Sequence, residues 1–132
     1  MQATGEFEVD LQPLEASLED AEGMRLGRMS IAKAFHGDLA GQSRGEMLTA
    51  MTPTEGSAGY VALEQVRGTL NGRSGTFLLQ HFGIMNRGEH RLVLEVVPDS
   101  GTEALEGLSG SMIIRIEDGR HRYQLEYSLD GS

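Results

Sequence analysis

The sequence contains no cysteine among its 132 residues. This absence excludes a disulfide framework, a thiolate zinc site, an iron–sulfur cluster held by cysteines and a cysteine nucleophile. The chain also lacks an apolar run near the roughly 20 residues that a membrane-spanning helix needs. Its first residues have neither the basic stretch nor the apolar run of a signal peptide. We therefore expect a cytoplasmic protein that does not bind membranes, folded as one domain over residues 1–132.

Basic residues are absent from the first 22 positions, although the whole chain carries a formal net charge of −9. The rest of the sequence is nearly balanced in charge. An acidic protein repels phosphate backbones, so we expect no nucleic-acid partner and interpret the acidic segment as an aid to solubility. The acids of this segment are Glu6, Glu8, Asp10, Glu15, Glu19, Asp20 and Glu22.

Helical periodicity is nearly absent, whereas alternation of apolar and polar residues recurs along the whole chain. Phe7, Val9 and Leu11 alternate with acids and predict a first strand, which Pro13 is expected to end. Residues 14–22 fit a loop or a short helix equally well, because they are fewer than the roughly 12–15 residues of a marginally stable helix. Seven further strands are predicted at about 24–36, 39–51, 58–70, 74–85, 90–98, 110–117 and 120–129.

Two dipeptides carry the strongest turn signals. Asn71-Gly72 and Asp118-Gly119 suit type I′ hairpin turns, which require positive φ at both central positions. Short connections of this kind, with no crossover helices, indicate an all-β fold. The prediction is a closed eight-stranded antiparallel meander barrel, since closure removes exposed strand edges.

One longer connection runs over residues 99–107. Ser100 and Glu103 have the spacing of a capping box, and Gly107 suits a helix C-terminus. A single helical turn is therefore predicted between the sixth and seventh strands.

Hairpin register decides which side chains share a face. A two-residue turn at Asn71-Gly72 places Ala62 opposite His81, with Tyr60 and Glu64 on its two diagonals, within reach of long side chains. We assign this face, which is rich in small residues, to the barrel interior. A buried carboxylate needs a partner, and an imidazole is a natural one. The cluster is either a satisfied network that fixes register or a ligand-orienting or acid–base site in a cavity.

The same inward wall carries further apolar and aromatic side chains. The predicted ligand-binding residues are Tyr60, Glu64, His81, Phe77, Leu94 and Tyr123. The four histidines show no metal-binding spacing and fall on different strands or strand ends, so neither a metal nor another cofactor is expected. No catalytic residue is assigned.

Several motifs resemble one family of small bacterial proteins. They are Phe35-His36-Gly37-Asp38-Leu39-Ala40-Gly41, Gly45-Glu46-Met47-Leu48, Gly59-Tyr60-Val61-Ala62, Gly68-Thr69-Leu70-Asn71-Gly72-Arg73-Ser74-Gly75-Thr76-Phe77, Gln80-His81 and Val97-Pro98-Asp99-Ser100-Gly101-Thr102. The chain is identified on these residues as similar to the domain of unknown function 3224 family. The resemblance implies a barrel like that of plant allene oxide cyclase and the dirigent proteins, which bind hydrophobic small molecules and form oligomers. No activity is carried over.

Three functional hypotheses follow. The first is a barrel that binds a small hydrophobic or amphipathic ligand. The second is an isomerase or cyclase-like enzyme that uses Glu64 and His81 as base and acid, with Tyr60 as a polar anchor. The third is a homo-oligomer, a dimer or trimer, that associates through apolar residues of the outer face. That face carries Val61, Leu63, Leu78, Phe82, Val93 and Val97.

Overall fold

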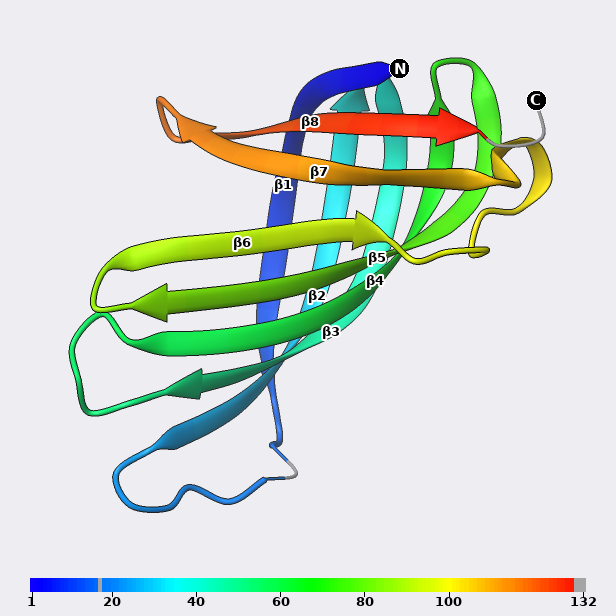
Figure 1. Cartoon of the computed structure of the whole chain (residues 1–132). Coiled ribbons are helices and arrows are strands. Elements are labelled where there is room, and N and C mark those ends of the chain that lie inside the picture. The colour runs from blue at the N-terminus through cyan, green and yellow to red at the C-terminus, as the bar shows by residue number, and fades with distance from the viewer. Residues whose placement is uncertain (17, 130–132) are drawn as a thin grey trace.

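A computed structural model describes residues 1–16 and 18–129 of the chain. Within these residues eight antiparallel strands follow one another in meander order, and β8 pairs with β1 to close a barrel (Figure 1). The predicted fold class is confirmed. The elements are β1 (Gln2–Leu14), β2 (Arg25–Gly37), β3 (Leu39–Met51), β4 (Ala58–Leu70), β5 (Arg73–Asn86), β6 (Glu89–Val96), the 3₁₀ helix η1 (Glu103–Leu105), β7 (Leu108–Glu117) and β8 (Arg120–Leu129).

The predicted registers are also confirmed. Around Asn71-Gly72, whose φ angles are 46° and 86°, β4 and β5 pair so that Ala62 lies opposite His81. His81 in turn lies opposite Leu94 on β6. The side chains that the turn chemistry assigned to one face therefore do share it.

Pro13 does not end the first strand, contrary to the prediction. β1 continues to Leu14, and Pro13 pairs with Met29 of β2. Pairing of β1 with β8 stops at Phe7, opposite His121, so beyond Phe7 the strand is paired on the β2 side. An edge position of this kind tolerates a residue that has no N–H to donate.

A short helix is one of two predictions for residues 14–22, and a single helical turn is predicted within residues 99–107. Around residues 14–22, of which Ser17 lies outside the described residues, the described part contains no helix, and Ala21 bridges Met24 across a turn. η1 does form in the connection before β7. Its first residue follows Thr102, which makes no side-chain cap, so the predicted capping box is wrong.

Ser100, the expected cap, instead accepts a hydrogen bond from the Leu78 N–H at 3.0 Å. The loop is thus tied to β5 rather than to its own helical turn. Among the described residues, no helix is long and apolar enough to span a membrane.

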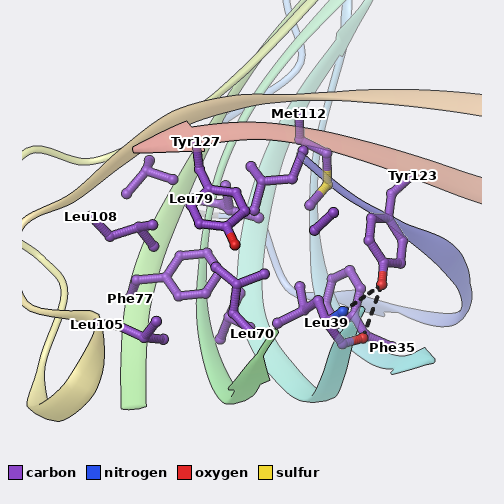
Figure 2. Packing of buried hydrophobic residues seen from close by; sticks show 14 of the residues in the cluster. Phe35, Leu39, Leu70, Phe77, Leu79, Leu105, Leu108, Met112, Tyr123 and Tyr127 are labelled. Atoms are coloured by element: carbon purple, nitrogen blue, oxygen red, sulfur yellow. Dashed lines mark hydrogen bonds between the residues drawn. The ribbon is translucent and has the colours of Figure 1, made fainter. Parts of the chain in front are cut away.

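A packed apolar core fills one end of the barrel, which we call the closed end. It lies between the Asn71-Gly72 turn and the η1 connection, and Phe77, Leu105 and Leu79 are at most 1% exposed there (Figure 2). Tyr123 ties this core to the β2–β3 turn, since its hydroxyl accepts from the Leu39 N–H at 2.9 Å. This end therefore has the close packing of a protein interior.

The opposite end, which we call the open end, carries the turns at 87–88 and 118–119 and the loops at 15–24 and 52–57. Toward it β6 and β7 diverge (Figure 1), and in the described chain they share two residue pairs, Leu94 with Met112 and Glu95 with Ser111. The sheet is consequently least tightly closed along this seam.

Candidate functional site

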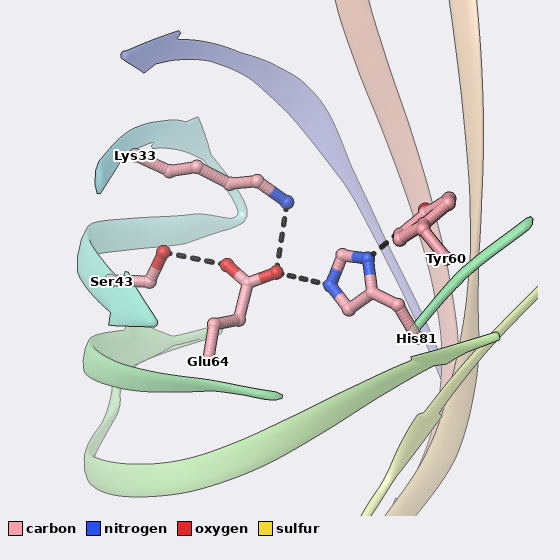
Figure 3. Close-up of polar contacts among 5 residues, drawn as sticks. All are labelled: Lys33, Ser43, Tyr60, Glu64 and His81. Carbon is pink, nitrogen blue, oxygen red and sulfur yellow. Dashed lines mark hydrogen bonds and ion pairs between the residues drawn. The ribbon is translucent and has the colours of Figure 1, made fainter. Parts of the chain in front are cut away.

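A layer of polar side chains crosses the barrel interior between its two ends. Four consecutive strands supply it: Lys33 from β2, Ser43 from β3, Tyr60 and Glu64 from β4, and His81 from β5 (Figure 3). Each side chain points inward because it alternates with exposed neighbours on a strand whose register is fixed by the adjacent hairpins. We call these five residues the polar layer.

Glu64 is the centre of the polar layer. Its Oε2 accepts from Lys33 Nζ at 2.9 Å and contacts Nε2 of His81, while its Oε1 accepts from Ser43 Oγ at 2.6 Å. The other ring nitrogen of His81, Nδ1, lies 3.4 Å from the Tyr60 hydroxyl. Within the described residues every buried side-chain nitrogen or oxygen has at least one hydrogen-bond partner, so no buried polar atom of the layer is left without one.

The electrostatics of the layer favour a charged carboxylate. Burial alone would raise the pKa of Glu64, but the hydrogen bond from His81, the Lys33 charge and the Ser43 hydroxyl together lower it to about 2. Lys33 is itself stabilised by Phe7, whose ring centroid lies 4.8 Å from Nζ. The layer therefore holds a buried ion pair at neutral pH.

Tyr60 is the member of the polar layer closest to solvent. It is half-buried, whereas Lys33, Ser43, Glu64 and His81 are buried. Its pKa is raised by burial and by the nearby negative charge of Glu64, so the phenol stays protonated.

The ring of Tyr60 lies directly on Gly83 of β5. A Cβ at Gly83 would stand 2.2 Å from Cε1 of Tyr60, far inside van der Waals contact. Gly83 is thus the residue that lets the phenol reach toward His81.

Tyr60, Glu64 and His81 are predicted from the sequence to lie together, and they do. Lys33 and Ser43, which donate the other hydrogen bonds to Glu64, are not among the predicted residues. A signal for Lys33 was present, because Lys33 shares its strand face with Ile31 and Phe35, both buried. Ser43 lies opposite Lys33 in the β2–β3 pairing.

The other three predicted ligand-binding residues lie in the closed end or beside it. Phe77 and Leu94 are each 1% exposed and belong to the packed core. Tyr123 faces the carbonyl oxygens of His36 and Leu39 at 2.9 and 3.0 Å. These three residues therefore lie in packed surroundings, and a ligand-binding role for them stays a prediction.

Inward side chains become progressively exposed from the polar layer to the open end. On β6, Val96 and Leu94 are buried but Leu92 is 43% exposed. On β7, Met112 is buried, Ile114 is half-buried and Ile116 is 69% exposed. The open end is therefore lined by apolar side chains that the protein itself does not cover.

A second feature lies on the outside of the barrel. A hollow of about 1200 Å³ runs over β3, β4 and β5, and its apolar lining comes largely from outward side chains such as Leu48, Val61 and Leu63. Arg28 and Arg44 border it. This surface lies on the reverse of the sheet that carries the polar layer.

The described residues contain no group of three His, Asp or Glu side chains placed to hold a metal ion. His36 pairs with Glu8 at 2.6 Å on the surface, and His81 belongs to the polar layer.

Fold and site together define a small closed meander barrel, packed at one end and divided by a buried ion pair. The family model described as "Protein of unknown function (DUF3224)" matches residues 3–127, and the chain belongs to this family. A crystal structure of a protein of unknown function from the DUF3224 family of Shewanella oneidensis MR-1 is 52% identical, with a TM-score of 0.97. The match covers 100% of this chain and 98% of that one. No curated protein matches the sequence.

Proposed function

We propose that the protein binds a small hydrophobic or amphipathic molecule at the open end of its barrel, above the polar layer. The observation that carries this proposal is the exposure of inward apolar side chains at that end, while the same faces are fully packed at the closed end. Apolar surface that is gathered in one place and left exposed marks a ligand-binding or interaction site.

The packing of the closed end supports the same proposal. A barrel of eight strands has room for its own side chains or for one small ligand. The closed end is filled by the protein's own leucine and phenylalanine side chains, so the open end is the part of the interior left for a ligand.

The test compares two neighbours on β6 that have similar exposure and opposite faces. Leu92 points inward and is 43% exposed, and Val93 points outward and is 40% exposed. N-phenyl-1-naphthylamine, which fluoresces strongly in apolar surroundings, is titrated into each protein. We expect Leu92→Glu to weaken binding at least about tenfold, because a charge then faces the apolar site, and Val93→Glu to leave binding unchanged.

Two outcomes would refute the proposal. One is the absence of any fluorescence increase with the unmodified protein. The other is a loss of binding in Val93→Glu with retention in Leu92→Glu, which would move the site to the outer face.

The acid–base alternative has less support from the geometry. Glu64 and His81 are buried, and the oxygens of Glu64 are already engaged by three partners. A general base must reach the proton it removes, directly or through one water. A ligand at the open end meets Tyr60 before it meets either residue.

A cytoplasmic location and a likeness to allene oxide cyclase stay predictions.

A second candidate function is self-association as a dimer or trimer through the outer face. One row of paired residues crosses four strands, and all of its members are at least 39% exposed: Leu48, Val61, Phe82 and Val93. Of the residues predicted for this face, Leu63 is also exposed, whereas Leu78 and Val97 are half-buried. An apolar row on a sheet face can pack against its own copy, as the sheets of a β-sandwich do.

Light scattering at high protein concentration tests this candidate. We expect a mass of two or three chains, which Val61→Glu reduces to one and Gln65→Glu, an outward change on the same strand, does not. A single-chain mass for the unmodified protein would refute it.

A further inference from the structure

The polar layer sets the direction of its own hydrogen bonds, beginning at Glu64. A carboxylate has no hydrogen to donate, so Lys33, Ser43 and the Nε2 of His81 must all donate to it. The low pKa of Glu64 keeps this group deprotonated. The proton of the His81 ring therefore sits on Nε2.

Lys33 fixes the charge of His81 as well. Lys33 and Glu64 already neutralise each other within a layer where both side chains are at most 5% exposed. A protonated His81 would place a second positive charge against the single Glu64 carboxylate and leave this buried site with a net charge, which is costly. With a neutral ring and its hydrogen on Nε2, Nδ1 carries a lone pair and can only accept.

Tyr60 is the last group in the chain of donors. Its hydroxyl lies 3.4 Å from Nδ1 of His81 and is the donor of that pair, since Nδ1 accepts. The phenol has one hydroxyl hydrogen, and here this hydrogen points toward Nδ1 of His81. The remaining hydrogen-bonding capacity of the Tyr60 oxygen is as an acceptor, and Tyr60 is the half-buried member of the polar layer.

We infer that the ligand of the open end is an apolar molecule with a hydroxyl or N–H group that donates a hydrogen bond to the Tyr60 oxygen, such as a long-chain alcohol or a phenol. This inference rests on the proposed function and names the class of molecule that the site prefers. A carboxylate or an ether, which can only accept, meets an acceptor at this position and leaves it unpaired.

The experiment is a competition for bound N-phenyl-1-naphthylamine by 1-decanol, methyl decyl ether and decanoate. The readout is the ratio of the inhibition constants for the ether and the alcohol, divided by the same ratio in Tyr60→Phe. This division cancels the different water solubilities of the two competitors. We expect a preference for decanol of about three- to tenfold, the usual effect of one net hydrogen bond, and its loss in Tyr60→Phe.

Tyr127→Phe is the matched control, because it removes a hydroxyl at the closed end, where Tyr127 Oη accepts from Asn71 Nδ2 at 2.7 Å. The preference for decanol should persist in this variant, and decanoate should compete less well than decanol. Circular dichroism of each variant establishes that the barrel is intact.

The possible failures are distinguishable. Equal competition by alcohol and ether in the unmodified protein, or a preference that survives Tyr60→Phe, would overturn the donor rule while leaving the proposed binding site in place. Failure of the probe to bind would overturn the proposed function, and this inference with it.

Discussion

The buried carboxylate makes a definite prediction about acid stability. The ordinary pKa of 4.5 for Glu64 falls to about 2 in the folded barrel. Because the folded-state pKa lies below the unfolded one, the stabilisation is complete above pH 4.5 and is lost as the pH falls toward 2. A difference of this size corresponds to about 3 kcal/mol of unfolding free energy, at 1.36 kcal/mol per pKa unit.

The variant that isolates this contribution is Lys33→Met combined with Glu64→Gln. It removes both charges at nearly constant volume and avoids an unpaired buried ion. Urea unfolding is followed by far-ultraviolet circular dichroism at pH 6 and pH 2. The unmodified protein should lose about 3 kcal/mol more between these pH values than the double variant does.

The matched control is the surface pair Arg28–Glu46, which joins the outward faces of β2 and β3, with Nη2 of Arg28 2.6 Å from Oε1 of Glu46. Arg28→Met with Glu46→Gln should follow the unmodified protein to within about 1 kcal/mol, since exposed ion pairs contribute little. If the Lys33/Glu64 double variant loses as much stability in acid as the unmodified protein, the carboxylate is not held in its charged form and the reasoning fails.

Three further predictions concern the polar layer, the two ends of the barrel and the contact between Gly83 and Tyr60. Lys33→Met alone should lower the unfolding free energy in urea by about 3–5 kcal/mol, because it leaves a buried carboxylate without its cation; a loss below 1 kcal/mol would contradict the buried ion pair. Phe77→Ala should cost about 3–5 kcal/mol and Leu92→Ala less than about 1 kcal/mol in thermal unfolding, and equal losses would mean that the open end is packed. Gly83→Ala should cost about 1–3 kcal/mol, and Tyr60→Ala should relieve most of it in a double-mutant cycle; additive losses would contradict the contact.

The fold could be predicted closely because turn chemistry is local. Asn71-Gly72 and Asp118-Gly119 each restrict the backbone to one type of hairpin, and one hairpin register places every residue of two strands. Tyr60, Glu64 and His81 lie on one such pair of strands, so their meeting was accessible from the sequence.

Lys33 and Ser43 could not be placed in the same way. The β2–β3 connection at Gly37-Asp38 is a weaker turn signal, and the distance between β2 and β4 depends on how strongly the sheet coils. Lysine is also rarely buried, so its position between Ile31 and Phe35 carried little weight by itself. The predicted strand end at Pro13 was wrong for a related reason. Pro13 is tolerated because β1 is an edge strand beyond Phe7, and that edge begins where β8 stops pairing with β1, which the residues of β1 alone do not show.

The buried ion pair and the unfilled end are connected. A packed core from one end to the other would need apolar side chains where Lys33, Ser43, Glu64 and His81 stand, and replacing buried ion pairs by such side chains often stabilises a protein. The barrel instead keeps a polar layer whose half-buried member is Tyr60, and the side chains above this layer are left exposed. A layer that only fixed register would gain nothing from the exposed Leu92 and Ile116 above it. The proposed site would use both features together, because it would orient an apolar molecule by a single polar contact.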